Sequence, residues 1–430
     1  MADNSRRDEK RDARIEEKRR KLAEQRIRRA QESVTYEPED FDYTSDGSRD
    51  NSVGTGQAVR KEVSGSGNGG NGRRRVRFRT KLSLVAAVLI LLLVVYGIFQ
   101  IKDYFNKRTD YRVTDEGFTH AERFENAVPI YGIDVSEHQP ADINWEKIKT
   151  SGVDYVFARA GYRGTDKGGL HIDENFEKYV KEADKAGLMI GAYFYSQALT
   201  PEEAIEEADF LLEQVKSYNI TLPLVIDYEI YKGGRLDKKI DAGEMYAASI
   251  YHDVVLAFCR HVEEAGYESA VYANKDMLTN YMQADLLDDS ATIWLARYDE
   301  KAGLKADYWF WQCSDSGQAG DMDELIDRDF WYMEPGKVYP TRGKTKRISD
   351  EQRISIGDCQ IHFKEYSSEL HHFRAVPKFS MTYDGRGMRK GRDYVASAVK
   401  NTEFGTGYVI IRGIGKYKDW IMYPFKIDKN

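Results

Sequence analysis

The sequence predicts an α/β protein: an irregular β/α barrel, preceded by one transmembrane helix and followed by a small all-β sandwich. Three observations support this. Short apolar runs alternate with amphipathic helical stretches in the middle of the chain, an uncharged apolar stretch precedes them, and turn-rich alternating runs follow them. The chain has 430 residues, which is too long for one ordinary domain, so several folded units are expected.

Residues 82–101 are predicted to form a single transmembrane helix. They read LSLVAAVLILLLVVYGIFQI and carry no formal charge, and about twenty helical residues span roughly 30 Å of hydrocarbon. The basic run RRRVRFRTK precedes them and mixed charges follow, so the positive-inside rule places the N-terminus in the cytoplasm and the C-terminal part outside the cell. A cleaved signal peptide is the alternative, but a long segment precedes this stretch and no small-residue cleavage site follows it cleanly.

Residues 1–81 are interpreted as a cytoplasmic tail. Its first part is almost entirely charged or helix-favouring, which is typical of a solvated, partly helical segment. A partner-binding helix or a contact with anionic lipid is the alternative. Residues 33–72 are rich in Ser, Gly, Asn and Asp and indicate a flexible linker. Residues 102–128 are expected to be an extracellular spacer.

The predicted barrel covers residues 129–336. Helices are expected at 175–187, 201–218 and 242–265, where apolar residues recur at helical spacing. Late helices are scarce, which departs from a regular eightfold barrel. The expected strands are 131–136, 154–162, 189–196, 222–230, 269–274, 292–298, 308–314 and 326–332.

Acidic residues recur in the predicted strands, and such barrels carry their chemistry at the C-terminal strand ends. Asp227 and Glu229 lie two residues apart in VIDYEI, so both point into the barrel mouth while Tyr228 points toward the helices. Neighbouring carboxylates raise the pKa of one member, which is the arrangement that a glycosidase needs. An exposed acidic strand end or a cation site is the alternative.

Several short segments together resemble glycoside hydrolase family 25, the Chalaropsis-type lysozymes. The resemblance covers roughly residues 131–332. It implies an irregular barrel of five β/α units followed by three strands, and cleavage of the β-1,4 bond between N-acetylmuramic acid and N-acetylglucosamine without a cofactor. The segments that carry it are GIDVSEHQ (132–139), FARAGY (157–162), GAYFYS (191–196), VIDYEI (225–230), VYAN (271–274), WLARY (294–298) and WQCS (311–314).

The resemblance also implies roles for four carboxyl groups. Glu229 matches the general acid of the family. Asp227 matches its partner carboxylate, which either orients the substrate's own N-acetyl group or stabilises the transition state directly. Asp134 and Asp327 match two further acids of the cleft, which would position water or sugar. Asp327 is the less secure match, because Asp329 lies on the same face of IDRDFW.

Six further positions match residues that line the family's cleft, although core packing is an alternative for each. Aromatic side chains stack on sugar rings, and a planar guanidinium can hold the muramyl carboxylate. The positions are Arg159, Tyr193, Tyr195, Trp294, Arg297 and Gln312. No metal site is expected, since His138 and His171 lack ligand-spaced companions. The three cysteines are widely spaced, and buried free thiols are expected.

The C-terminal part divides into a basic linker, residues 337–349, and a β module, residues 350–430. The segment from 390 to 427 resembles the Ig-like repeats of Gram-positive surface proteins, which implies a small β-sandwich that serves as a spacer or in adhesion to the wall or to a partner. The matching residues are Gly391, Asp393, Tyr394, Asn401, Thr402, Gly413, Gly415 and Tyr417.

The net charge of -7 and the pI near 5.8 argue against nucleic acid as a partner. We therefore expect a membrane-anchored extracellular lysozyme whose partner is the peptidoglycan glycan strand. A protein partner for the cytoplasmic tail or the C-terminal module remains open. The alternatives are a catalytically silent barrel that binds glycan or a partner at the cell surface, and an enzyme that acts on another aminosugar polymer.

Overall fold

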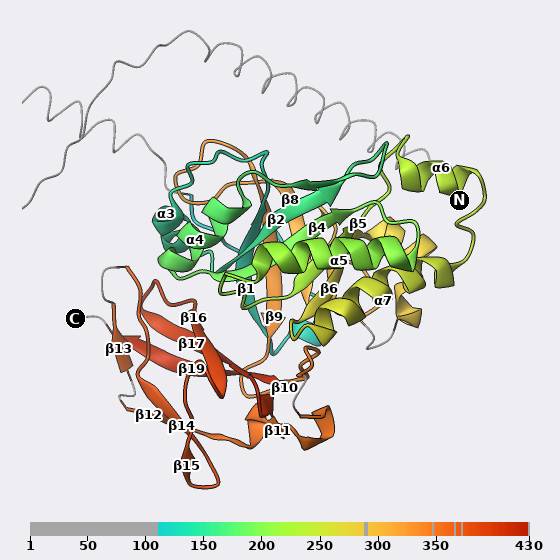
Figure 1. Ribbon diagram of the computed structural model, residues 1–430. Coiled ribbons are helices and arrows are strands. Elements are labelled where there is room, and N and C mark those ends of the chain that lie inside the picture. Colours follow the sequence, from blue (N-terminus) through green and yellow to red (C-terminus); the bar gives the residue numbers. More distant parts are fainter. Residues whose placement is uncertain (1–110, 288–290, 346–347, 365–366, 371–372, 429–430) are drawn as a thin grey trace, which may run out of the picture. The chain divides into compact units, whose positions relative to one another are not determined.

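The computed structural model describes residues 111–430, apart from 288–290, 346–347, 365–366, 371–372 and 429–430 (Figure 1). The predicted cytoplasmic tail, the predicted transmembrane helix at 82–101 and the first part of the predicted spacer, residues 102–110, lie outside these residues. Within the described ranges, no helix is long and apolar enough to span a bilayer.

A nine-stranded sheet closes into the predicted barrel. Closure occurs because β1 pairs with both β2 and β9, while the short strand β3 (Leu170–Ile172) only extends the edge of β2. The strands of the closed ring are β1 (Val128–Val135), β2 (Tyr155–Arg163), β4 (Met189–Ser196), β5 (Leu224–Tyr228), β6 (Ser269–Asn274), β7 (Ile293–Ala296), β8 (Phe310–Gly317) and β9 (Ile326–Met333). Each predicted strand is present.

Strand β9 runs antiparallel to both of its neighbours, whereas the other pairs around the ring are parallel. This corrects one expectation about the acids. Asp327 lies at the beginning of β9, not at its C-terminal end. Because the strand is antiparallel, its beginning lies at the same mouth as the C-terminal ends of the other strands, and Asp327 pairs directly with Asp134.

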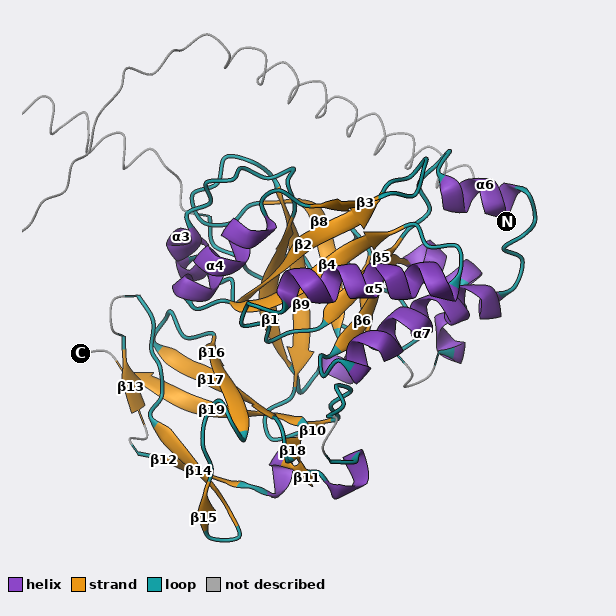
Figure 2. Ribbon diagram, viewed as in Figure 1, coloured by secondary structure: helices purple, strands orange, loops and turns teal. Residues whose placement is uncertain are grey.

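Helices cover the outside of the early strands (Figure 2). Thr200 caps α5 by accepting a hydrogen bond from the Glu203 N–H, and Gly187 ends α4 at a positive φ of 85°. The predicted helix at 242–265 begins only at Ala248, and α3 and α6 were not expected. The helices are α3 (Trp145–Thr150), α4 (Phe176–Ala186), α5 (Pro201–Val215), α6 (Arg235–Asp241) and α7 (Ala248–Glu264). Between β6 and β7 the described residues form only a π-helical turn, Met277–Tyr281, and a 3-10 turn, Ala284–Leu286.

Aromatic rings fill the interior of the barrel beneath its mouth. Strand residues alternate between the two faces, so Tyr155 and Phe157 point inward while Val156 packs against the helices. Phe157 stacks on Trp294 at 4.4 Å between ring centroids, and Phe310 stacks on Trp331 at 5.5 Å. The mouth of the barrel therefore lies directly above a layer of packed apolar side chains. The predicted buried free thiols are confirmed for Cys259, Cys313 and Cys359.

The C-terminal region is rich in β-structure, as predicted. Its largest sheet has the order β10-β19-β17-β16, with β13 also on β19. The Ig-like class is a finer statement that stays a prediction. The strands are β10 (Val338–Tyr339), β11 (Ile354–Ser355), β12 (Gln360–Phe363), β13 (Ser367–Glu369), β14 (Phe379–Tyr383), β15 (Arg386–Gly387), β16 (Tyr394–Val399), β17 (Gly405–Gly413), β18 (Tyr417–Lys418) and β19 (Trp420–Asp428).

This region packs against the end of the barrel opposite the mouth. Trp420 and Met422 of β19 belong to the same buried cluster as the rings inside the barrel. The buried Asp154 carboxylate accepts hydrogen bonds from Lys149 Nζ at 2.6 Å and from the Lys400 N–H at 2.9 Å. The segment predicted as a linker takes part in this junction, since β10 pairs with β19.

Candidate active site

A cavity of about 210 Å³ opens at the mouth of the barrel, and all four predicted catalytic carboxyl groups line it. Asp227 is the second-last residue of β5, and Glu229 follows directly after that strand. Asp134 comes from the end of β1 and Asp327 from the start of β9. The remaining lining residues are Ser136, His138, Arg159, Tyr193, Tyr272, Trp294, Tyr298 and Gln312.

The alternation predicted for VIDYEI is confirmed. Tyr228 is fully buried on the outer face of the barrel, and its hydroxyl donates to the Ala198 carbonyl oxygen at 2.8 Å. The Gln197 amide donates to the carbonyl oxygen of Glu229 at 2.9 Å. These two bonds, both made by the segment after β4, hold the end of β5 in place and thereby fix the two acids that face the cavity.

Gln312 lies at the centre of a hydrogen-bond network on the other side of the cavity. Its Oε1 atom accepts from the Tyr272 and Tyr298 hydroxyls, each at 2.8 Å. Its Nε2 group donates to Asp134 Oδ2 at 2.6 Å. Two phenol donors on one oxygen fix which way the amide faces, so the amide nitrogen must point at the Asp134 carboxylate.

Burial raises the pKa of both inward acids. The pKa of Asp227 lies well above its ordinary value, because of burial first and then the charges of Glu229 and Asp134. The pKa of Asp134 is also well raised, by burial and then by Asp329, although the hydrogen bond from Gln312 opposes this. Glu229 is more accessible than either. A cluster of this kind retains a proton at a pH where exposed carboxyl groups are ionised.

Asp329 lies beneath the cavity and does not line it. Its side chain is buried, and it accepts a hydrogen bond from Trp294 Nε1 at 2.9 Å. Burial raises its pKa well above the ordinary value, against the Trp294 hydrogen bond. Trp294 is also buried, at 1% exposure, so it serves as a wall that holds Asp329 and offers little ring surface to a sugar.

Arg159 lines the cavity but is already paired with two carboxylates of the protein. Its Nε lies 2.8 Å from Asp173 Oδ2, and its Nη2 lies 3.0 Å from Glu137 Oε1. The expectation that this guanidinium holds a muramyl carboxylate therefore requires it to exchange one of these partners or to share its charge with three acids.

Tyr195 and Arg297 are the predicted residues that do not line the cavity. Arg297 instead pairs with Asp299 at 2.9 Å. Tyr195 lies close to the acids, since burial and then Asp227 and Glu229 raise its pKa. Sequence reasoning missed Tyr272 and Tyr298 as site residues, although both occur in the segments VYAN and WLARY that carried the resemblance. Within the described ranges, no group of three or more His, Cys, Asp or Glu side chains is placed to hold a metal ion.

Comparison with known proteins agrees with this geometry. Residues 133–322 match the family model described as glycosyl hydrolases family 25. The autolytic lysozyme of Clostridium acetobutylicum is 24% identical over 199 residues, which cover 46% of this chain and 54% of the relative. Lysozyme M1 of Streptomyces globisporus is 25% identical over 218 residues, covering 46% of this chain and 67% of the relative. The chain thus spans between about half and two thirds of the curated relatives it matches.

Solved structures were matched as well. The modular autolysin LytC from Streptococcus pneumoniae aligns with a TM-score of 0.41 and 22% identity, over 47% of each chain. The spore cortex lytic enzyme SleM from Clostridium perfringens aligns with a TM-score of 0.42 and 14% identity, over 70% of this chain and 98% of the other.

A closed barrel with a cluster of carboxyl groups at its mouth has the groups that acid-base hydrolysis of a glycosidic bond requires. The family match is more specific, since residues 133–322 of the barrel are similar to glycosyl hydrolases family 25. The predicted enzyme class is therefore confirmed, while the assignment of roles to single residues stays a prediction.

Proposed function

We propose that this protein is a muramidase that hydrolyses the β-1,4 bond between N-acetylmuramic acid and N-acetylglucosamine in peptidoglycan. The observation that carries the proposal is the set of four carboxyl groups around one cavity, with two of them buried and Glu229 accessible. The lysozymes named above, to which the barrel is similar, support the choice of substrate.

In the proposed reaction, Glu229 donates a proton to the glycosidic oxygen as its bond to the anomeric carbon breaks. Asp227 either orients the N-acetyl group of the substrate, whose oxygen then attacks the anomeric carbon, or stabilises the positive charge that develops there. Water then completes hydrolysis and returns a proton to Glu229. Asp134 and Asp327, paired across β1 and β9, position the water or the sugar from the opposite side.

The test is digestion of purified peptidoglycan by the full chain and by a Glu229→Gln variant. The wild type should release fragments that end in reducing N-acetylmuramic acid. The variant should be slower by roughly 10²–10⁴-fold, because Gln keeps the size of the side chain but has no proton to donate. Release of fragments ending in N-acetylglucosamine would contradict the bond assignment. Binding to the wall without any release would favour the catalytically silent barrel.

We also propose that residues 82–101 anchor the protein in the cell membrane, with the N-terminus in the cytoplasm and the barrel outside. The uncharged stretch and the basic run before it support this arrangement. Protease added to wall-stripped cells should then remove the barrel and leave the tail protected inside. Loss of the tail with retention of the barrel would reverse the orientation. For residues 350–430 we propose the Ig-like class, as a spacer or wall-contacting module.

A further inference from the structure

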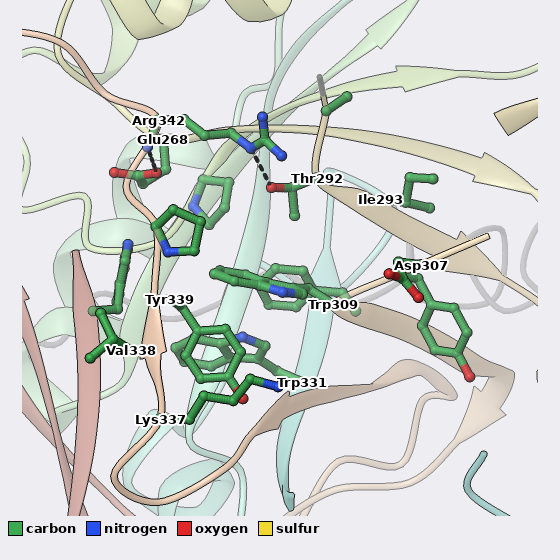
Figure 3. Close-up of a pocket in the computed structure, with 16 residues that line it drawn as sticks. Glu268, Thr292, Ile293, Asp307, Trp309, Trp331, Lys337, Val338, Tyr339 and Arg342 are labelled. Carbon is green, nitrogen blue, oxygen red and sulfur yellow. Dashed lines mark hydrogen bonds between the residues drawn. The ribbon is translucent and has the colours of Figure 1, made fainter. Parts of the chain in front are cut away.

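A second cavity, of about 240 Å³, lies at the end of the barrel opposite the catalytic mouth (Figure 3). The barrel contributes residues around the starts of β7 and β8, and the end of the antiparallel β9. The C-terminal region contributes β10 with its flanks and the start of β19. The residues that matter for its chemistry are Trp309, Trp331, Lys337, Tyr339, Arg342 and Trp420.

Aromatic rings form a corner and a floor in this cavity. Trp309 and Tyr339 are partly exposed, and their rings meet edge-on at 5.1 Å with an interplanar angle of 85°. Trp331 and Trp420 are almost fully buried and meet at 6.0 Å and 84°. A partly exposed corner over a buried aromatic floor presents flat, apolar faces toward a small ligand.

The two buried tryptophans each carry an unused hydrogen-bond donor. Among the described residues, neither Trp331 Nε1 nor Trp420 Nε1 has an acceptor, although the side chains are only 1% and 2% exposed. Because both nitrogen atoms are themselves buried, they lie behind the cavity wall, and the two rings contribute its apolar floor.

Two cationic side chains complete the cavity. Lys337 and Arg342 lie on opposite sides of the rings in the view of Figure 3. Arg342 Nε donates to Thr292 Oγ1 at 3.0 Å, and the guanidinium forms no ion pair among the described residues. Lys337 Nζ lies 3.7 Å from Glu334 Oε2 and 5.4 Å from the centroid of the Tyr339 ring.

The acids at this cavity are already occupied. Glu268 is buried and accepts from the Thr341 hydroxyl and the Arg342 N–H, with Arg412 Nη1 at 3.7 Å. Asp307 pairs with Arg123 at 2.8 Å. The cavity therefore presents donors and positive charge, together with aromatic faces, to whatever enters it.

We propose that this cavity binds one unit of an acidic saccharide. The C–H face of a sugar ring packs on Trp309 and Tyr339, and its carboxylate pairs with Lys337 or Arg342. The volume lies below the roughly 300–1,000 Å³ of drug-sized pockets, which favours a single sugar unit. The inference does not depend on the proposed function, because this site can bind sugar whether or not the mouth cleaves it.

The test is calorimetric binding to the full chain in detergent, carrying Glu229→Gln so that cleavage cannot consume the probe. The probe is the disaccharide of N-acetylglucosamine and N-acetylmuramic acid. Two sites are expected in this parent. Adding Trp309→Ala should weaken one site by about tenfold or abolish it, because the stacking face is lost. Trp309→Phe should retain both sites. Phe404→Ala, which removes an aromatic side chain that is 54% exposed and does not line this cavity, is the matched control and should also retain both.

A neutral probe, the disaccharide of N-acetylglucosamine, tests the charge. It should bind the second site more weakly, and Lys337→Gln with Arg342→Gln should remove the difference between the two probes. Binding in the parent that both Trp309→Ala and Tyr339→Ala leave unchanged, whether at one site or at two, would overturn the proposal. Equal affinity of the two disaccharides would overturn its acidic part. Failure of the wild type to cleave peptidoglycan would count against the muramidase proposal alone.

Discussion

The two ends of the barrel are built from the same strands but carry opposite chemistry. Gln312 of β8 lines the mouth, and Trp309, the residue before β8, lines the second cavity at the opposite end of the barrel, which we call the far cavity. The two residues are three positions apart, or about 10 Å along a strand. Strand β9 gives Asp327 to the mouth and Trp331 to the far cavity. The mouth gathers carboxyl groups and phenols, and the far cavity gathers indoles and cations.

The rings between the two ends explain why the acids of the mouth are unusual. Trp294 stacks on Phe157 beneath the carboxyl groups and leaves little room for water. Burial is accordingly the first cause of the raised pKa values of Asp134, Asp227 and Asp329. The two acids of the far cavity, in contrast, are each close to an arginine. Changes at the mouth should therefore alter turnover, and changes at the far end should alter binding.

The largest effect is expected from Asp227→Asn at the mouth. Both candidate roles of Asp227 need a group that can carry a charge or a proton, and Asn can do neither. We expect kcat to fall by roughly 10²–10³-fold with little change in wall binding. Release of reducing ends from purified walls measures kcat, and sedimentation with the walls measures binding.

Trp309→Ala serves as the opposite control for this experiment. It should reduce binding to walls while leaving kcat on a short soluble substrate close to that of the wild type. If Asp227→Asn instead lowers both wall binding and kcat, the hypothesis that the mouth determines turnover while the far cavity determines binding is wrong.

A smaller effect is expected from Gln312→Met, which keeps the side-chain length but removes the amide. Asp134 then loses the hydrogen bond that opposes the rise of its pKa, and two phenols lose their acceptor. We expect about a tenfold fall in kcat/KM at neutral pH. If ionised Asp134 is needed, the acid side of the pH profile should also move to higher pH, and a profile with the shape of the wild type would show that it is not. Trp309→Ala should leave the profile unchanged.

The sequence was sufficient for the barrel and for most of the mouth. Alternation within VIDYEI predicts that Asp227 and Glu229 face the cavity while Tyr228 faces the helices, and this holds because a strand has a fixed period of two. Asp327 lines the cavity as predicted even though β9 is antiparallel to its neighbours. Reversing a strand changes its direction, but alternate residues still point into the barrel. Local pattern thus fixes which side of the sheet a residue takes.

The remaining features depend on contacts between distant parts of the chain. Tyr298 follows the end of β7, and the pairing of β7 with β8 brings its hydroxyl to Gln312. The far cavity exists because β10 pairs with β19 against the starts of the barrel strands. Neither of these two strand pairings can be predicted from a short segment of sequence. The sequence therefore showed that several residues of this cavity are aromatic, but not that they lie together.

The smallest effect is expected from Asp329→Asn, and it concerns stability. Burial raises the pKa of Asp329 above its ordinary 3.8, so the folded state binds a proton that the unfolded state has released. Stability is then greatest below that ordinary value and falls as pH rises toward the raised pKa of the folded state. Asn keeps an oxygen acceptor for Trp294 Nε1 but has no proton to lose.

The full chain with Asp329→Asn should therefore show a flatter dependence of its melting temperature on pH, and melt roughly 2–4 °C higher than the wild type at pH 7. Asp307→Asn, at a side chain that is 93% exposed at the rim of the far cavity, is the matched control and should leave the slope unchanged. Calorimetric melting between pH 4 and pH 8 measures both variants. An unaltered slope in Asp329→Asn would mean that Asp329 is ionised in the folded protein and that its charge is balanced by groups other than Trp294.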